Sequence, residues 1–240
     1  MTDQVERTRP GAVRIFACTM HNHDFLWFSS QEISKRSTTI PVLHNFALTY
    51  ALSDFSYGIR ANSIPSYQAD LAQMPIYATP AVSTSAVLTR FTYNAVNSRS
   101  LRTDDAPRGV NSPDLGWRVM IEPSMADSSP GGRTGFSFYA FTFDGARPRA
   151  VARLGKKGAA VRVVAREITE LRLVRATEQT RPTHAVNPLD VGGKIVSYEP
   201  VAIPPHLVLR QATIVDDWFA LSGQHRIHVP VSVAKKIGLG

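Results

Sequence analysis

The residues best suited to chemistry form one basic segment, residues 147–175. It carries nine Lys or Arg residues against two Glu residues, a net charge of +7, whereas the whole 240-residue chain has a formal net charge of +8. Inside it, Gly155 and Gly158 bracket Lys156 and Lys157. Glycine permits positive φ and a close approach of backbone to a ligand. Two ammonium groups and exposed amides at such a turn favour phosphate binding, and a solvated basic loop is the alternative.

Histidines and one carboxylate raise the question of a metal site. His21, His23 and Asp24 follow the first apolar run, and His44 comes later in the chain. A His-x-His pair on a strand presents both rings on one face, where packing or hydrogen bonding is the usual role. A zinc site needs a further defined ligand, which this pattern lacks. We therefore expect no metal.

Metal-independent RNA cleavage would require a general base, an acid and a cation near the scissile phosphate. His21, Lys35, His44 and Tyr50 could supply such a set, although nothing in their spacing requires it. The Gly155–Gly158 turn lacks Walker spacing, and no nucleophile-elbow motif accompanies a serine. We expect a non-catalytic protein without cofactors, and an endoribonuclease remains the alternative.

Composition favours an anionic polymer as the partner. The chain has 27 Lys and Arg residues and a pI near 9.9, and 21 of these cations are Arg, whose planar fork suits phosphate oxygens. No basic amphipathic helix stands out for a membrane surface. Residues 1–10 lack the apolar core of a signal peptide, and no apolar run approaches the roughly twenty residues needed to span a bilayer. Cys18 is the only cysteine, so we expect a cytoplasmic protein without disulfides.

The elements that would position these groups can be placed from apolar patterns. Residues 13–20 predict a central first strand, and residues 29–39 a polar loop. Pro41 predicts the start of a helix that ends at Leu52, because proline suits the first helical turn and the apolar residues have helical spacing. Residues 54–116 predict a thumb-like insertion. It contains strands at 77–81 and 86–94 and a long polar loop, which is usually functional or disordered.

The second half of the chain predicts mostly strands. Residues 135–143 alternate aromatic and small side chains, which could stack on bases or, as we favour, fill a core. Asp144 and Gly145 predict a turn. After the basic turn, a strand places Arg162 and Arg166 opposite apolar side chains. Residues 185–240 predict a β-rich C-terminal part with strands at 196–203, 207–214 and 226–233.

Four motifs in this order resemble one known family. Residues 43–52, with a Leu-His-Asn-aromatic-Ala pattern after the first strand, resemble the helix of the type I-D branch of Cas family five, Csc subunit one. Residues 77–81 resemble the next landmark of that branch. Residues 147–149 followed by 153–156 resemble its proline-containing basic loop, and residues 187–190 resemble a fourth landmark. Together they span residues 14 to about 190.

The resemblance implies an α+β fold formed by residues 1–240 as a single RAMP-type domain, with a ferredoxin-like, RNA-recognition-like core, an inserted thumb hairpin and the β-rich C-terminal part. It implies a non-catalytic subunit of a type I-D CRISPR Cascade complex that holds the 5′ handle of the crRNA. Its partners would be the Cas family seven backbone subunits and the large subunit, with target DNA near its flanking motif as a further candidate.

The resulting hypothesis assigns RNA contacts to cations of the basic segment, of residues 35–36 and of the thumb. The expected RNA-binding residues are Arg147, Arg149, Arg153, Lys156, Lys157, Arg162, Lys35 and Arg36, and those near the thumb tip are Arg99, Arg102 and Arg108.

Overall fold

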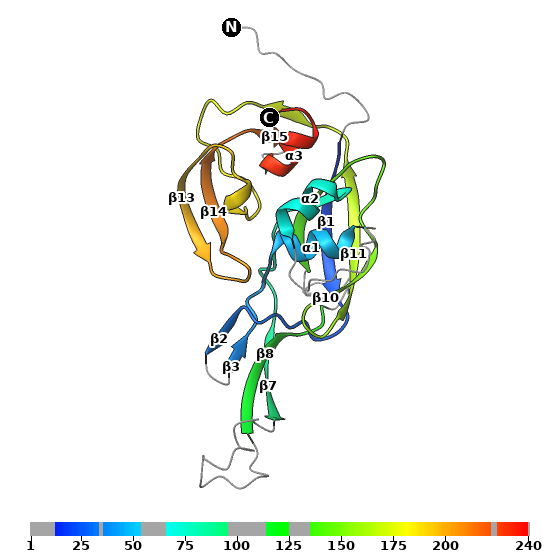
Figure 1. Ribbon diagram of the computed structural model, residues 1–240, viewed down its shortest axis with the longest axis vertical. Coiled ribbons are helices and arrows are strands. Elements are labelled where there is room, and N and C mark those ends of the chain that lie inside the picture. Colours follow the sequence, from blue (N-terminus) through cyan, green and yellow to red (C-terminus); the bar gives the residue numbers. More distant parts are fainter. Residues whose placement is uncertain are drawn as a thin grey trace.

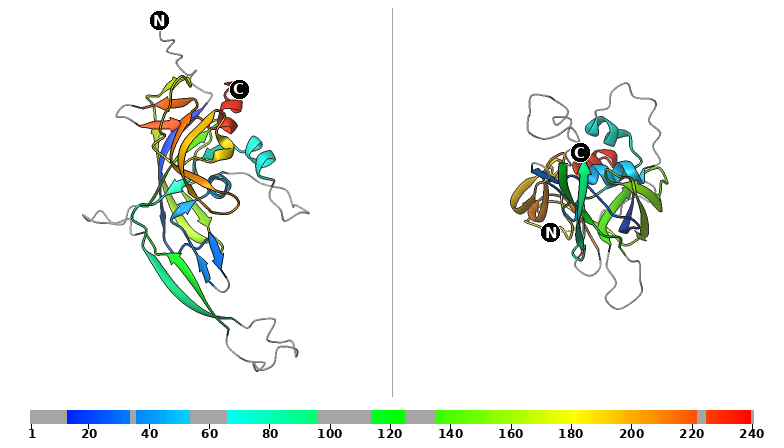
Figure 2. Two further views of the ribbon diagram at one scale, coloured as in Figure 1. Left: turned by 90° about the vertical axis from the view of Figure 1, so that its left-hand side faces the viewer. Right: turned by 90° about the horizontal axis from the view of Figure 1, so that it is seen from below.

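The computed structural model describes residues 13–33, 36–53, 66–95, 114–124, 135–221 and 225–239. It shows a mixed fold in which strands dominate and the helices are few and short (Figure 1). The main sheet is antiparallel and curls into a half-barrel, and a long hairpin projects from one end of it (Figure 2). None of the helices in the described ranges is long and apolar enough to cross a membrane.

Seven strands form the main sheet, in the order β10-β11-β1-β9-β6-β4, with β5 also paired to β9. Their bounds are β1 (Arg14–Asn22), β4 (Val42–Leu43), β5 (Ile76–Ala78), β6 (Ala81–Val82), β9 (Phe136–Thr142), β10 (Val151–Leu154) and β11 (Ala159–Ile168). The prediction of a central first strand is confirmed, because β1 lies between β11 and β9.

The aromatic residues of β9 fill the core. Phe136, Phe138 and Phe141 are 1%, 3% and 0% exposed, so the core reading is confirmed for them and base stacking is excluded. Phe136 and Phe138 pack with Leu48 of α1 on one face of the sheet. Tyr139 points to the opposite face and is only partly buried.

Helix α1 (Asn45–Leu52) begins later than predicted. The predicted start at Pro41 is wrong because Val42 and Leu43, both buried, pair with β6 instead. His44 then accepts a hydrogen bond from the Phe46 amide through Nδ1, 3.2 Å away, and caps the helix. The amides of the first helical turn have no partner within the helix, and the His44 side chain supplies one for the Phe46 amide. A second helix, α2 (Tyr67–Gln73), follows.

The projecting hairpin consists of β7 (Leu88–Ala95) and β8 (Asp114–Ile121), which pair antiparallel. Strand β3 (Arg36–Thr38) runs parallel to β8, and β2 (Gln31–Ile33) pairs with β3. The predicted loop at 29–39 is therefore wrong: short strands at the edge of this four-stranded sheet tolerate polar side chains. The range 54–116 contains β5 and β6 of the main sheet as well as β7.

Strands also dominate the C-terminal part. They are β13 (Lys194–Val201), β14 (Val208–Val215), β15 (Trp218–Ala220) and β16 (Arg226–His228), and β12 (Arg172–Val174), which precedes this part, pairs with β15. The 3-10 turn η2 (Pro188–Asp190) and helix α3 (Val231–Lys236) complete it. The strand predicted at 226–233 is too long, because Pro230 lacks an amide hydrogen, ends the strand region and serves as the N-cap of α3. In this part, Phe219, Ile227 and Val233 cover Ile15 and Phe141 at one end of the main sheet.

Candidate nucleic-acid interface

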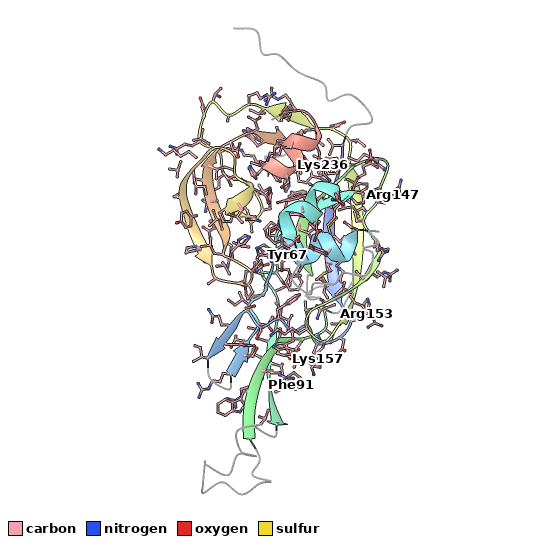
Figure 3. The ribbon with its side chains drawn as sticks, in the orientation of Figure 1. Tyr67, Phe91, Arg147, Arg153, Lys157 and Lys236 are labelled. Atoms are coloured by element: carbon pink, nitrogen blue, oxygen red, sulfur yellow. The ribbon has the colours of Figure 1, made fainter. Side chains whose placement is uncertain are left out.

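The predicted basic turn joins β10 to β11. Gly155 and Gly158 have φ values of 78° and 64°, so the prediction of positive φ at both glycines is confirmed. Lys156 and Lys157 between them are exposed. Figure 3 shows Lys157 near the point where the β7–β8 hairpin leaves the sheet, and Arg153 farther along the same side. Two lysine ammonium groups therefore stand at the junction of sheet and hairpin.

The close approach at Gly155 involves the protein itself. A Cβ at Gly155 would lie 2.7 Å from the carbonyl oxygen of Trp27. That carbonyl accepts a hydrogen bond from the Lys156 amide at 2.9 Å, and the Gly158 amide donates to the Gly155 carbonyl at 3.0 Å. The expectation that these glycines bring backbone amides to a phosphate is wrong for these two amides. Gly155 docks the turn onto the Trp27 segment.

Lys156 is partly neutralised. Its ammonium lies 3.3 Å from a carboxylate oxygen of Glu32 in β2 and 5.3 Å from the centre of the Trp27 ring. The hydrogen bond from Ser29 and the neighbouring Lys156 lower the pKa of Glu32. Both side chains of the ion pair are more than half exposed, and exposed pairs are weak. A phosphate could therefore displace Glu32 from Lys156 at little cost.

Of the other predicted cations, Arg153 and Arg162 lie beside this turn. Arg153 donates from its guanidinium to the Gly158 carbonyl at 2.9 Å, which fixes it against the turn. Arg162 is exposed on β11, opposite Val151 and His21. Arg147 and Arg149 are exposed in the loop before β10, and Figure 3 shows Arg147 pointing outward at the same edge as Arg153. Lys35, Arg99, Arg102 and Arg108 lie outside the described residues.

Guanidinium groups lie over the rings of two tryptophans at the base of the hairpin, and two of them, those of Arg90 and Arg118, were not predicted from the sequence. The guanidinium of Arg36, which was predicted, lies 4.7 Å from the centre of the Trp117 ring, and Arg90 lies 5.7 Å from it. Arg118 lies 4.2 Å from the centre of the Trp27 ring. Such cation–π contacts hold guanidinium groups over the rings. An Arg next to an aromatic residue in each of β7 and β8 is the signal that could have identified them.

The candidate acid–base residues His44, Tyr50 and His21 lie among packing and hydrogen-bonding contacts within the fold. Burial and then the neighbouring His206 lower the pKa of His44 to about 3, and His44 caps α1 while its ring packs on Phe46 and His206. Tyr50 donates to Asp70. His21 lies on β1 opposite Arg162. Across the described residues there is no group of three or more His, Cys, Asp and Glu side chains that could hold a metal ion.

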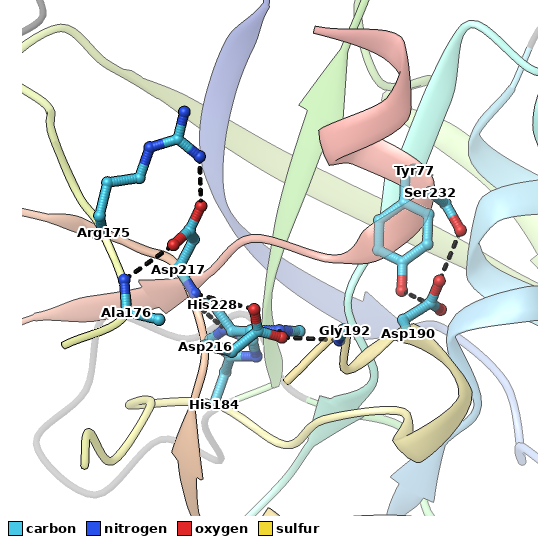
Figure 4. Close-up of polar contacts among 10 residues, drawn as sticks. All are labelled: Tyr77, Arg175, Ala176, His184, Asp190, Gly192, Asp216, Asp217, His228 and Ser232. Atoms are coloured by element: carbon cyan, nitrogen blue, oxygen red, sulfur yellow. Dashed lines mark hydrogen bonds and ion pairs between the residues drawn. The ribbon is translucent and has the colours of Figure 1, made fainter. Parts of the chain in front are cut away.

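Three of the four sequence landmarks meet in a buried polar network. Figure 4 shows its contacts of Tyr77 and Ser232 with Asp190. The Tyr77 hydroxyl donates to Asp190 at 2.6 Å and accepts from Asn45 at 3.2 Å. Asn187 donates to the Asn45 side chain at 3.1 Å. Ser232 of α3 also donates to Asp190. The network ties α1, β5, η2 and α3 together, so these landmarks maintain the fold, and the basic landmark alone lies at the candidate interface.

Comparison with known families gives a match over almost the whole chain. The profile described as Type I-D CRISPR-associated protein Cas5/Csc1 matches residues 13–237. No curated protein matches the chain. The family match includes the main sheet, the hairpin, the C-terminal part and the basic turn. The chain belongs to the type I-D Cas5/Csc1 family of CRISPR-associated proteins.

Proposed function

We propose that this protein is a non-catalytic guide-RNA-binding subunit of a type I-D CRISPR interference complex, which holds the 5′ handle of the crRNA. Membership of the type I-D Cas5/Csc1 family supports a role in CRISPR interference. The observation that supports RNA binding is the basic turn between β10 and β11: Arg153, Lys156, Lys157 and Arg162 are all exposed on these two paired strands and the turn that joins them. Concentrated cations of this kind bind phosphates without reading sequence.

The sheet topology is consistent with a RAMP-type, ferredoxin-like core. Strands β11, β1, β9 and β5 lie in that order, and α1 connects β1 to β5 in the sequence. This is the strand order of a ferredoxin-like βαββαβ unit. Along the chain, β10 and the basic turn come directly before β11, at the place where such a unit has its second helix. Under this proposal, β10 and the basic turn replace the second helix and bind the RNA.

Contacts to the Cas family seven backbone subunits and the large subunit are part of the proposal, and membership of the CRISPR-associated family supports a place in an effector complex. The hairpin is the element available to reach a neighbouring subunit, because it extends well beyond the main sheet (Figure 2). Target DNA near its flanking motif is a further proposed contact. Co-purification of the full chain with each subunit in turn tests these contacts.

The experiment that tests RNA binding replaces both turn lysines with Glu. Lys156→Glu with Lys157→Glu should weaken binding of the repeat-derived handle RNA across sequences. Loss of two phosphate contacts should reduce the slope of log K against log salt by about 1.4 for a single strand. The matched control, Lys194→Glu with Lys235→Glu, makes the same charge change at exposed lysines of the C-terminal part. Equal affinity and slope in the two double variants would refute the assignment of this turn.

The non-catalytic role has its own test. Repeat RNA incubated with the purified protein in EDTA should stay intact, because His44 is neutral, caps α1 and packs against rings. Cleavage under these conditions that is lost in His44→Ala would establish the endoribonuclease instead. Binding measured on the same samples separates loss of activity from loss of fold.

A further inference from the structure

A pocket lies between the main sheet and the C-terminal part. It has a volume of about 720 Å³ and is lined by β1, β9 and β11 on one side and by segments 181–185 and 210–211 on the other. This volume falls within the ~300–1,000 Å³ typical of ligand pockets. The pocket lies on the sheet face opposite α1, because α1 packs with the Phe136 and Phe138 side of β9.

Small side chains form the floor of the pocket. Ala17 pairs with Tyr139 and Thr19 with Ser137, and paired residues of antiparallel strands share a face. Ala17, Thr19, Ser137 and Tyr139 all line the pocket. Alanine, threonine and serine leave space above the sheet, and Tyr139 supplies a ring at the edge of that space. A flat group such as a nucleobase could rest on this floor beside the tyrosine.

Three guanidinium groups surround the floor. Arg166 of β11, Arg181 and Arg210 of β14 line the pocket, and no Asp or Glu is among the described residues that line it. Arg181 donates to the side chain of Gln211, a neutral acceptor, at 2.6 Å. Arg210 forms an exposed ion pair with Glu199, whose carboxylate oxygen lies 3.8 Å from Nε, and exposed pairs of this kind are weak. Within the described ranges, Arg166 has no ion-pair partner. Clustered arginines of this kind fit a phosphate group.

The pocket and the basic turn are linked by one exposed face of the sheet. Arg162 and Arg166 lie on the same exposed face of β11, about 13 Å apart along the strand for four residues. Arg153 pairs with Ala160 and so shares that face. Arginines therefore mark a path over the sheet from the turn to the pocket, and a single strand bound at the turn could follow it.

We propose that this pocket receives one nucleotide of a single-stranded nucleic acid, its phosphate between Arg166, Arg181 and Arg210 and its base on the floor beside Tyr139. The proposal rests on the proposed function, since the same strand would be held by the basic turn. Guide RNA and displaced target DNA share this chemistry, and the experiment below distinguishes them.

The test is site-specific photocrosslinking to the full-length protein. Single-stranded RNA and DNA of the same sequence each carry one photoreactive 4-thiopyrimidine, moved by one position from probe to probe. One position should crosslink to peptides that contain Thr19 or Tyr139. Ser137→Trp fills the pocket without changing charge, and it should reduce this crosslink roughly tenfold, the size of one stacked base. Crosslinks to the basic turn should persist in this variant.

A second pair of variants covers the case in which Ser137→Trp does not fold. Arg166→Glu should also reduce the pocket crosslink, whereas Lys194→Glu, at an exposed lysine outside the pocket, should leave it unchanged. A pocket crosslink with RNA assigns the guide as the ligand, and one with DNA assigns the target. No pocket crosslink with either strand, or one that survives both Ser137→Trp and Arg166→Glu, would overturn the proposal. Unchanged binding after Lys156→Glu with Lys157→Glu would instead refute the role of the turn.

Discussion

Removal of one hydroxyl group should reveal how much the buried network contributes to stability. Tyr77→Phe deletes the donor to Asp190 and the acceptor for Asn45. Tyr77, Asp190 and Asn45 are 4%, 5% and 0% exposed, so water cannot readily replace the lost partner. Burial and then the nearby Asp190 raise the pKa of Tyr77 well above its ordinary value. The hydroxyl therefore keeps its proton and donates at all ordinary pH values.

The expected cost follows from the two lost hydrogen bonds. A hydrogen bond to a charged group contributes roughly 1.5–3 kcal/mol, and a buried group left without a partner costs about 1–3 kcal/mol. Asp190 retains the donor Ser232, which limits the loss. We expect Tyr77→Phe to lower the free energy of unfolding by about 2–4 kcal/mol. At about 2–4 °C per kcal/mol for a chain of this size, Tm should fall by roughly 5–15 °C.

Urea unfolding monitored by circular dichroism measures this cost. The matched control is Tyr198→Phe, because Tyr198 is 53% exposed. It should change stability by less than about 0.5 kcal/mol. A double-mutant cycle with Asp190→Ala should give a combined cost below the sum of the single costs, since both changes break the same bond. If Tyr77→Phe is no more destabilising than Tyr198→Phe, the network does not hold these elements together.

Three further outcomes follow from the described contacts. Gly158→Ala, at φ 64° with its nearest neighbour 3.9 Å away, should lower the free energy of unfolding by about 1 kcal/mol. Gly155→Ala should cost clearly more in the same urea experiment, because its Cβ would meet the Trp27 carbonyl at 2.7 Å; equal costs would disprove that close approach. Burial lowers the pKa of His184 from its ordinary value of 6.5 to about 4 in the folded protein. As the pH falls below 6.5, His184 is therefore protonated in the unfolded chain before it is protonated in the folded protein, which favours unfolding. Between about pH 7.5 and about pH 5 this ring should remove about 2 kcal/mol of stability, and His184→Gln should lose correspondingly less over that interval. Burial raises the pKa of the Cys18 thiol to about 12, so a disulfide reagent should modify it roughly a hundredfold more slowly in the native protein than in urea; rapid native modification would contradict its burial.

Regular apolar patterns predicted the parts of the fold that carry them. Residues 13–20 and 135–143 formed central strands because alternating large apolar side chains must be buried on one sheet face. Asp144 and Gly145 formed the expected turn, both with positive φ. The two glycines of the basic turn were likewise located correctly. In each case a local signal, either alternation or glycine, was sufficient.

Errors arose where tertiary pairing decided the structure. Val42 and Leu43 fit a helical stripe, yet pairing with Ala81 and Val82 makes them a strand. Residues 31–33 and 36–38 are mostly polar, yet β3 pairs with β8 and β2 pairs with β3. The pocket could not have been predicted, because its arginines come from positions 166, 181 and 210 and meet only after the C-terminal part folds over the sheet.

The basic turn illustrates how local and tertiary signals combine. Its charges and glycines were evident in the sequence, but the purpose of Gly155 depends on Trp27, which lies far away in the chain. Lys156 and Arg118 both lie at the Trp27 ring, so this residue joins the turn to the base of the hairpin. A nucleic acid bound at the turn would therefore also lie close to the hairpin cations. Because the turn is held to Trp27 by a backbone hydrogen bond, a shift of the hairpin base would move the turn lysines with it.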